Sequence, residues 1–134
     1  METSQTKVSA QQKIERVRKM YEVLNDGDVK GSSEFLSNDL TFYTPVFPKP
    51  LDKDGLIAAS QRIVDSTDEY KIDVHDILAN EDHVVSVFVV RGRRGDRVLN
   101  ERGVHVMHLN SDGKIAAVWA VTDPKPHLAL WGET

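Results

Sequence analysis

The chain has 134 residues, of which 40% are hydrophobic and 28% charged, a composition typical of one globular domain. It contains no cysteine, which excludes thiol catalysis, thiolate zinc sites and disulfide scaffolds. The net charge of −4 argues against a nucleic-acid partner, because phosphate-binding surfaces carry a basic excess. Neither a long apolar run nor a secretory signal is seen, so we expect a soluble, cytoplasmic protein without membrane contact.

The first part of the chain predicts a loose arm followed by a helix. Residues 1–8 are polar and patternless. Ser9 and Gln12 form a capping-box pattern, after which apolar residues recur at helical spacing until residues 25–27 stop the run. This is the longest helix that the sequence predicts.

Two shorter helices flank a strand and a loop. The second helix is expected to begin at an Asp28 cap and to end at residues 37–39. Residues 40–44 then predict a short strand, and the proline-rich residues 45–51 predict a loop. A third helix is expected to begin at a cap provided by Asp52 or Asp54 and to end near residues 65–66.

From residue 70 the hydrophobic period changes from 3.6 to 2. Turn-forming residues divide this part into four expected antiparallel strands, at about 70–79, 83–91, 97–109 and 114–122. The order of elements predicts an α+β fold, in which a curved antiparallel sheet is packed by three N-terminal helices. We expect one domain over residues 1–134, with its core at about 10–123.

The C-terminal tail, residues 124–134, is too hydrophobic to stay in water. It contains Leu128, Leu130 and Trp131 among its apolar residues. We therefore expect it to pack across the sheet or onto a second subunit.

Three segments carry a resemblance to a known family. They are residues 20–28 (Met-Tyr-Glu-Val-Leu-Asn-Asp-Gly-Asp), residues 35–45 (Phe-Leu-Ser-Asn-Asp-Leu-Thr-Phe-Tyr-Thr-Pro), and the hairpin 104–115 followed by Trp119. Together they resemble the nuclear-transport-factor-two-like superfamily and, within it, the SnoaL-like group, over nearly the whole domain. The resemblance implies a cone: a strongly bent sheet around the first helix, a mostly apolar pocket, and usually a homodimer joined through the outer sheet face.

This fold resemblance does not define an activity. The superfamily contains ketosteroid isomerases, polyketide cyclases, epoxide hydrolases, dehydratases and non-catalytic binding modules. In isomerase-type members a carboxylate base precedes the proline after the first strand, where this chain has Thr44. Their tyrosine donor falls on Met20, beside Tyr21, and their second donor falls on His105. These departures argue against a ketosteroid isomerase and leave room for a different acid/base arrangement in the same cavity.

His105 is the first candidate catalytic residue. Strand alternation puts it on one face with Gly103 and Met107, and the resemblance turns that face toward the pocket. A neutral imidazole in an apolar cavity can accept or donate a proton near neutral pH. The alternative is a histidine that is hydrogen-bonded within the sheet and has no catalytic role.

Tyr21, Thr44 and Asp123 complete the candidate catalytic set. The Tyr21 hydroxyl suits an oxyanion or carbonyl contact, and Thr44 could position a substrate oxygen or a water. Asp123 follows the last strand and could orient a histidine or activate water at the pocket rim. Their alternatives are core packing for Tyr21 and a turn or cap before Pro124 for Asp123.

The candidate ligand-binding residues are apolar or aromatic side chains expected near the pocket. Tyr43 and Trp119 have alternatives, because Tyr43 faces outward if its neighbours face inward, and Trp119 suits a dimer interface. The full set is Val17, Met20, Phe42, Tyr43, Met107, Val118, Trp119 and Ala120.

Neither a metal site nor a cofactor is expected. His75, Asp76, His83 and His108 lack the spacing of metal ligands. A glycine-rich phosphate loop and a nucleophile elbow are also missing from the sequence.

Two classes of function remain. One is a SnoaL-like, cofactor-independent cyclase, isomerase or dehydratase that acts by acid/base catalysis on a small apolar carbonyl compound of polyketide or terpenoid type. The other is a non-catalytic module of the same fold that binds a hydrophobic small molecule or a protein. For either class we expect a homodimer, because the outer sheet face would otherwise expose an apolar strip of Val104, Val106, Trp119 and Val121.

Overall fold

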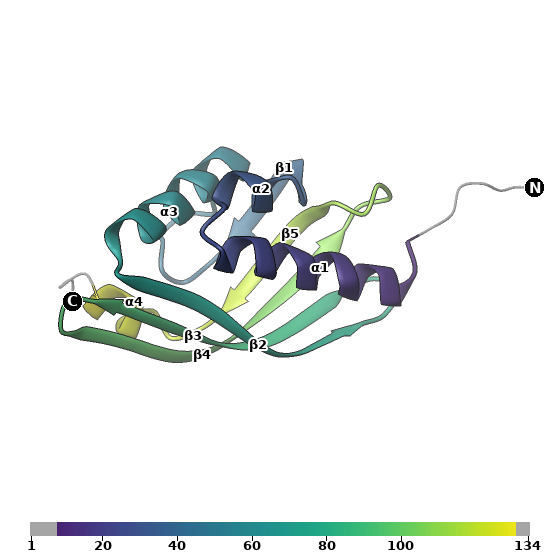
Figure 1. Ribbon diagram of the computed structural model, residues 1–134. Helices are drawn as coiled ribbons and strands as arrows, with labels where there is room; N and C mark the ends of the chain where they lie inside the picture. Colours follow the sequence, from purple (N-terminus) through teal and green to yellow (C-terminus); the bar gives the residue numbers. More distant parts are fainter. Residues whose placement is uncertain (1–7, 131–134) are drawn as a thin grey trace, which may run out of the picture.

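The protein folds as one strongly curved sheet with helices on its concave side (Figure 1). The computed structural model describes residues 8–130. Its elements in chain order are α1 (Ala10–Asn25), α2 (Val29–Ser33), β1 (Leu36–Tyr43), α3 (Lys53–Ser66), β2 (Glu69–Ala79), β3 (Val84–Arg94), β4 (Arg97–Leu109), β5 (Ile115–Val121) and α4 (Pro124–Leu130). The predicted α+β class and bent sheet are confirmed. The expected loose arm falls almost wholly on residues 1–7, which lie outside the described residues.

The helices begin where the sequence places their caps. Ser9 and Gln12 form both hydrogen bonds of the capping box at the start of α1. Asp28 caps α2 and Asp52 caps α3, each by accepting a hydrogen bond from a glycine N–H in the first turn. After α1, Gly27 adopts a positive φ of 83°, which lets the chain reverse into α2.

The second helix is shorter than predicted and the first strand longer. α2 ends at Ser33, and β1 already begins at Leu36, where a continued helix was expected. The backbone explains the difference, because Ile115 N–H donates to the Phe35 carbonyl and Leu36 pairs with Ile115. Tertiary pairing with a distant strand thus overrides the local helical pattern.

The sheet is mixed rather than wholly antiparallel. Its strand order is β1-β5-β4-β3-β2, and every neighbouring pair is antiparallel except β1 and β5, which run parallel. The prediction of a wholly antiparallel sheet was wrong for β1. The alternation of apolar residues along a strand does not show which strand it pairs with or in which direction. The parallel pair is possible since α3 and three strands supply the long connection it needs.

A tight hairpin sets the register between β3 and β4. Arg94 pairs with Arg97 across the turn, whose Gly95 has a positive φ of 64°. Eight residues from the turn along each strand, this register places Ser86 directly opposite His105. The position of a polar pair in the middle of the sheet therefore follows from a turn far away at its end.

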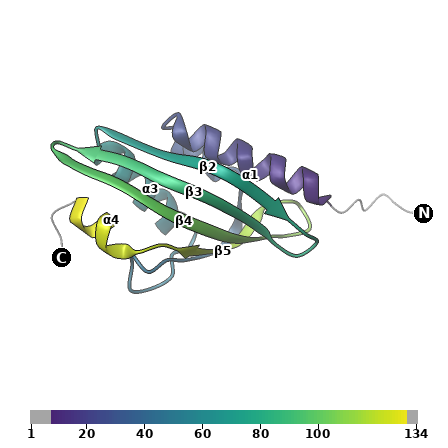
Figure 2. The same cartoon turned by 90° about the horizontal axis from the view of Figure 1, so that it is seen from below.

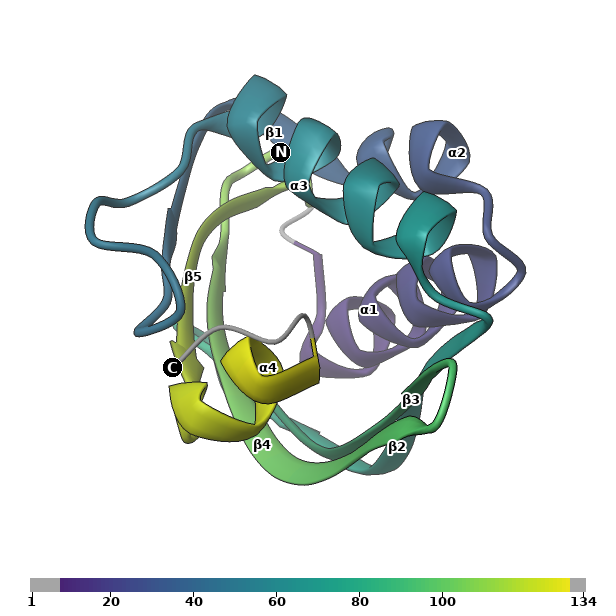
Figure 3. The same ribbon diagram turned by 90° about the vertical axis from the view of Figure 1, so that its left-hand side faces the viewer.

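The tail folds back instead of leaving the domain. Residues 124–130 form α4, a fourth helix beyond the three predicted, which packs on β4 and buries Leu130 in the core. Viewed end-on, α4 lies at the near end of the curved sheet, while α1 and α3 lie across its open side (Figure 3). The tail was expected to pack across the sheet or onto a second subunit, and Leu130 does pack against the sheet. Trp131 lies outside the described residues. None of the helices over residues 8–130 is long and apolar enough to cross a membrane.

Candidate functional site

A mostly apolar cavity lies between the concave face of the sheet and the helices. Its volume is about 450 Å³, which is within the range of small-molecule sites. The walls come from α1, α2, α3, the loop after β1, the inner faces of the strands, and residues of α4. Among the described residues that line it, none is an aspartate or a glutamate. Ionisable side chains in the lining are Tyr21, Arg62, Tyr70, His105 and His127.

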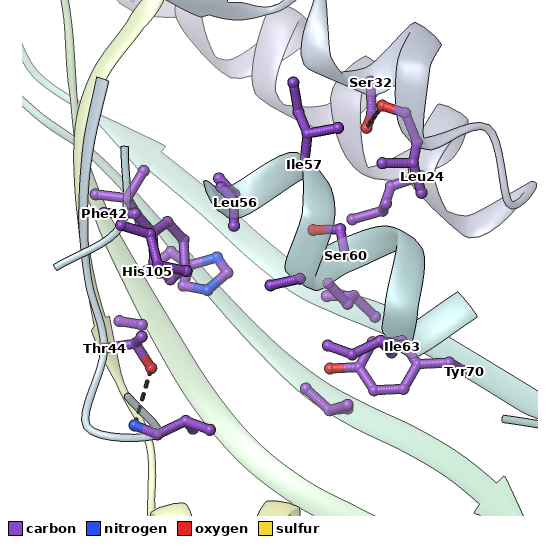
Figure 4. A pocket seen from close by; sticks show the side chains of 18 of the residues that line it. Leu24, Ser32, Phe42, Thr44, Leu56, Ile57, Ser60, Ile63, Tyr70 and His105 are labelled. Carbon is purple, nitrogen blue, oxygen red and sulfur yellow. Dashed lines mark hydrogen bonds between the residues drawn. The ribbon is translucent and has the colours of Figure 1, made fainter. Parts of the chain in front are cut away.

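His105 lies on the inner face of β4, as its alternation predicts. Its neighbours across the sheet are Ser86 on β3 and Ala120 on β5. The imidazole packs between two aromatic rings, with its centroid 4.5 Å from that of Phe88 and 5.9 Å from that of Phe42. Figure 4 shows the ring pointing from β4 toward the cavity. The solvent-accessible part of His105 therefore faces the cavity interior.

A chain of three hydrogen-bonded side chains connects His105 to the core. The Tyr21 hydroxyl lies 2.7 Å from His105 Nδ1 and 2.5 Å from Ser86 Oγ. The Tyr21 and His105 rings are nearly parallel, with an angle of 9° between their planes. Tyr21 and Ser86 are almost fully buried, so each of these polar atoms depends on the others for its hydrogen bonds.

Burial keeps these groups uncharged. It lowers the pKa of His105 from 6.5 to about 4, because the imidazolium form would lose its hydration among apolar side chains. It also raises the pKa of Tyr21 well above the usual 10, an effect that the hydrogen bond with Ser86 partly opposes. At neutral pH the chain of side chains therefore consists of a neutral phenol and a neutral imidazole.

Most of the candidate residues line the cavity. Thr44 does so at the end of β1, and its Oγ1 accepts a hydrogen bond from the Val46 N–H (Figure 4). The remaining candidates that line the cavity come from α1, β1, β4 and β5, and are Met20, Tyr21, Phe42, His105, Met107, Val118 and Ala120.

Four candidate residues lie elsewhere. Val17 is fully buried in the core below the cavity, since the apolar face of α1 is broader than the part that the cavity reaches. Tyr43 and Trp119 lie on the outer face of the sheet, where their rings stack 5.8 Å apart. Asp123 is exposed, and its Oδ1 accepts from the Lys125 N–H at the start of α4. That contact is the cap which the sequence offered as the alternative.

Sequence reasoning missed several polar groups of the cavity. Ser86 is a single polar residue in the apolar run 84–90, on the same strand face as Val84 and Phe88, and that isolation was the available signal. Tyr70 lines the far end of the cavity, with burial raising its pKa to about 12 (Figure 4). Its neutral hydroxyl can donate to a ligand.

A second polar position lies where α4 meets the cavity. Thr122 and His127 both line the cavity, and Thr122 Oγ1 and His127 Nδ1 are buried without hydrogen-bond partners. Burial lowers the pKa of His127, although the nearby backbone of Asp123 opposes this effect. The sequence assigned this segment only to packing. Within residues 8–130 there is also no cluster of three or more histidines, aspartates or glutamates that could hold a metal ion.

Comparison with known proteins places this geometry in a family. Residues 17–118 match the family described as the SnoaL-like domain, which is more than half of the chain. The chain therefore belongs to the SnoaL-like family. No curated protein matches its sequence.

Solved structures share the fold at low sequence identity. Bal32a, from a soil-derived mobile gene cassette, superposes with a TM-score of 0.80 at 21% identity, over 91% of this chain and 98% of the other. IdmH, a proposed polyketide cyclase from Streptomyces antibioticus, gives 0.76 at 22% identity, over 90% and 99%. An LEH-like epoxide hydrolase from M. tuberculosis gives 0.75 at 17% identity, over 91% and 93%. At these identities the likeness concerns the fold, while the activities of the relatives differ.

Proposed function

We propose that this protein is a cofactor-independent cyclase, isomerase or dehydratase that acts on a small apolar carbonyl compound of polyketide or terpenoid type. The observation that carries the proposal is His105, a neutral, hydrogen-bonded imidazole that faces a mostly apolar cavity of about 450 Å³. An ionisable group in such surroundings is typical of a catalytic centre. The family and the IdmH likeness support the substrate class.

Each residue of the site has a role in this proposal. His105 contacts the substrate oxygen and assists proton movement there. Thr44 and Tyr70 hold the substrate through their hydroxyl groups, because both side chains line the same cavity. Tyr21 is a positioning residue, since its hydroxyl is bonded to His105 Nδ1 and Ser86 rather than directed to a ligand.

The alternative function is a non-catalytic module that binds a hydrophobic small molecule. One observation favours it: Thr44 stands where isomerase-type relatives carry their carboxylate base, and no described lining residue replaces that carboxylate. Threonine is too weakly acidic to act as such a base. Under this alternative the cavity and its polar groups would serve recognition only.

We also propose that the protein is a homodimer joined through the outer face of the sheet. Figure 2 shows this face without helices across the middle of its strands. Several large apolar side chains are exposed there, among them Tyr43, Val87, Trp119 and Val121, which is 61% exposed. Monomeric proteins rarely leave such a group of apolar residues in water.

Product analysis distinguishes the two functions. A panel of polycyclic ketones and related carbonyl compounds is screened by thermal shift, and each ligand is then incubated with wild type and with His105→Ala. The enzyme proposal expects at least one ligand to be converted by wild type and much more slowly by the variant. Ligands that bind and are never converted would establish the binding module instead.

A further inference from the structure

The hydrogen bonds of His105 leave one ring nitrogen for a ligand. Nδ1 is bonded to the Tyr21 hydroxyl at 2.7 Å. Within the described part of the chain no protein group hydrogen-bonds Nε2, and the ring faces the cavity (Figure 4). A neutral imidazole carries one proton, so its position decides whether Nε2 donates or accepts a hydrogen bond.

Two arrangements of protons are compatible with the distances. In the first, the Ser86 hydroxyl donates to the Tyr21 oxygen, the Tyr21 hydroxyl donates to Nδ1, and the His105 proton lies on Nε2. In the second, every bond is reversed: Nδ1–H donates to the Tyr21 oxygen, the Tyr21 hydroxyl donates to Ser86 Oγ, and Nε2 is bare. The oxygen and nitrogen positions are the same in both.

Burial distinguishes the two arrangements. Ser86 is fully buried, and its only side-chain hydrogen bond is the one to Tyr21. In the reversed arrangement the Ser86 hydroxyl proton has no acceptor, and a buried donor without an acceptor is costly. In the first arrangement every donor of the three side chains is used except Nε2–H, which faces the cavity.

The chemistry of the partners points the same way. The first arrangement joins the better donor, a phenol, to the better acceptor, an imidazole nitrogen. The reversed one makes a phenol oxygen accept from an imidazole N–H while the phenol donates to an aliphatic hydroxyl. Burial of Tyr21 keeps its proton in place, so the phenol remains a donor.

We propose that Ser86 and Tyr21 hold neutral His105 with its proton on Nε2, so that the cavity selects an uncharged ligand with a hydrogen-bond acceptor, such as a carbonyl oxygen. The choice of ligand rests on the proposed function, whereas the position of the proton does not. His105 then acts as a donor toward the ligand oxygen. A ligand that presents only an N–H group to His105 would meet another N–H there and leave both unpaired.

The proton position is measured directly by nuclear magnetic resonance. Two-bond 15N–1H correlation spectra of protein labelled with 15N-histidine are recorded at pH 7, and the His105 signals are assigned by their loss in His105→Gln. We expect the pattern of an Nε2–H ring in the free protein. An Nδ1–H pattern would overturn the proposal, whatever activity the protein has.

Three probes of similar shape test the selection of the ligand. They are 1-indanone, which has only an acceptor, indole, which has only a donor, and indane, which has neither. Wild type is expected to bind 1-indanone roughly three- to tenfold more tightly than indane, the range of a net hydrogen bond, and indole no more tightly than indane. Indole binding as tightly as 1-indanone would contradict the proposed selection.

Tyr21→Phe removes the hydroxyl that fixes the ring, and Tyr43→Phe is its matched control. We expect mixed tautomers of His105 in Tyr21→Phe and a ratio of 1-indanone to indole affinity that falls toward one. Tyr43 lies on the outer sheet face, so Tyr43→Phe should retain the wild-type spectrum and ratio. If Tyr21→Phe does not fold, the spectrum and probe affinities of wild type decide the question. A protein with the Nε2–H pattern that converts no ligand would retain this inference and lose only the enzyme proposal.

Discussion

The two faces of the sheet at β4 and β5 have opposite characters although their residues alternate along the same strands. On the inner face, His105 and Val118 line the cavity. The buried hydroxyl of Tyr21, itself hydrogen-bonded to Ser86, holds the imidazole of His105. On the outer face, Trp119 stacks on Tyr43 and is 40% exposed. A shift of one residue in register would exchange the two sets.

The difference shows how one sheet can serve two purposes. The inner face has few polar groups, and those of the Ser86, Tyr21 and His105 chain satisfy one another. The outer face carries exposed aromatic and aliphatic side chains, and no helix of the described residues covers the middle of its strands. We therefore expect catalysis at the inner face and dimerisation at the outer face. A variant on one face should change the property of that face and leave the other unchanged.

The largest effect is expected from His105→Ala. If the protein is an enzyme, this change should lower the rate of the chemical step by roughly 10² to 10⁴-fold, the usual contribution of a positioned acid or base. Single-turnover kinetics with a converted ligand measure the step. Trp119→Ala is the matched change on the outer face and should leave the rate unchanged. Equal rates in wild type and His105→Ala would remove His105 from the mechanism.

A second effect concerns stability in acid. The unfolded chain protonates His105 near pH 6.5, while the folded chain does so only near pH 4. Its contribution to stability is complete above pH 6.5 and is lost as the pH falls toward 4, about 3 kcal/mol over that range. His105→Gln should therefore lose less free energy of unfolding than wild type between these pH values, measured by urea unfolding.

The control for the acid prediction is His108→Gln. His108 is exposed on the same strand, so this variant removes a histidine and leaves the buried imidazole of His105 in place. The groups that face His105 are Tyr21 from α1, Ser86 and Phe88 from β3, and Phe42 from β1, and none of them titrates between pH 4 and 7. If acid lowers the free energy of unfolding of wild type and of His105→Gln equally, the imidazole is already hydrated in the folded protein.

A third effect tests the outer face. Trp119→Ala should weaken the proposed homodimer by about 2 kcal/mol or more, because central aromatic residues dominate such interfaces. Sedimentation equilibrium of wild type and variant measures the dissociation constant. Val98→Ala is the control, since Val98 is exposed near the hairpin tip, six residues along β4 from Val104. A wild type that is monomeric at micromolar concentration would contradict the dimer.

Local patterns in the sequence were sufficient for the helix starts and for the set of residues that share a strand face with His105. Ser9, Asp28 and Asp52 are caps that act within one turn, and alternation along β4 groups His105 with Gly103 and Met107 on one face. Both depend only on neighbouring residues. Caps and the grouping of residues on a strand face could therefore be predicted without knowing the rest of the fold, whereas the direction of that face toward the cavity was predicted from the family resemblance.

Features that depend on distant partners could not be predicted. β1 pairs in parallel with β5, more than seventy residues away, and this pairing turned residues expected to be helical into strand. Val17 belongs to the same apolar face of α1 as Met20, yet only Met20 reaches the cavity. Ser86 became part of the site through its pairing with His105 on the neighbouring strand, nineteen residues away in the sequence.

The smallest effect, and the most specific, is the coupling between Tyr21 and Ser86. Ser86→Ala alone should cost about 1 kcal/mol, the net value of a buried hydrogen bond. In a double-mutant cycle with Tyr21→Phe, the two changes remove the same bond, so their combined cost should fall short of the sum by about 0.5 to 1.5 kcal/mol. Tyr43→Phe combined with Ser86→Ala should be additive, because these residues lie on opposite faces. Additivity in the first cycle would show that Ser86 does not bond to Tyr21, and the argument for the Nε2 proton would then lose its structural basis.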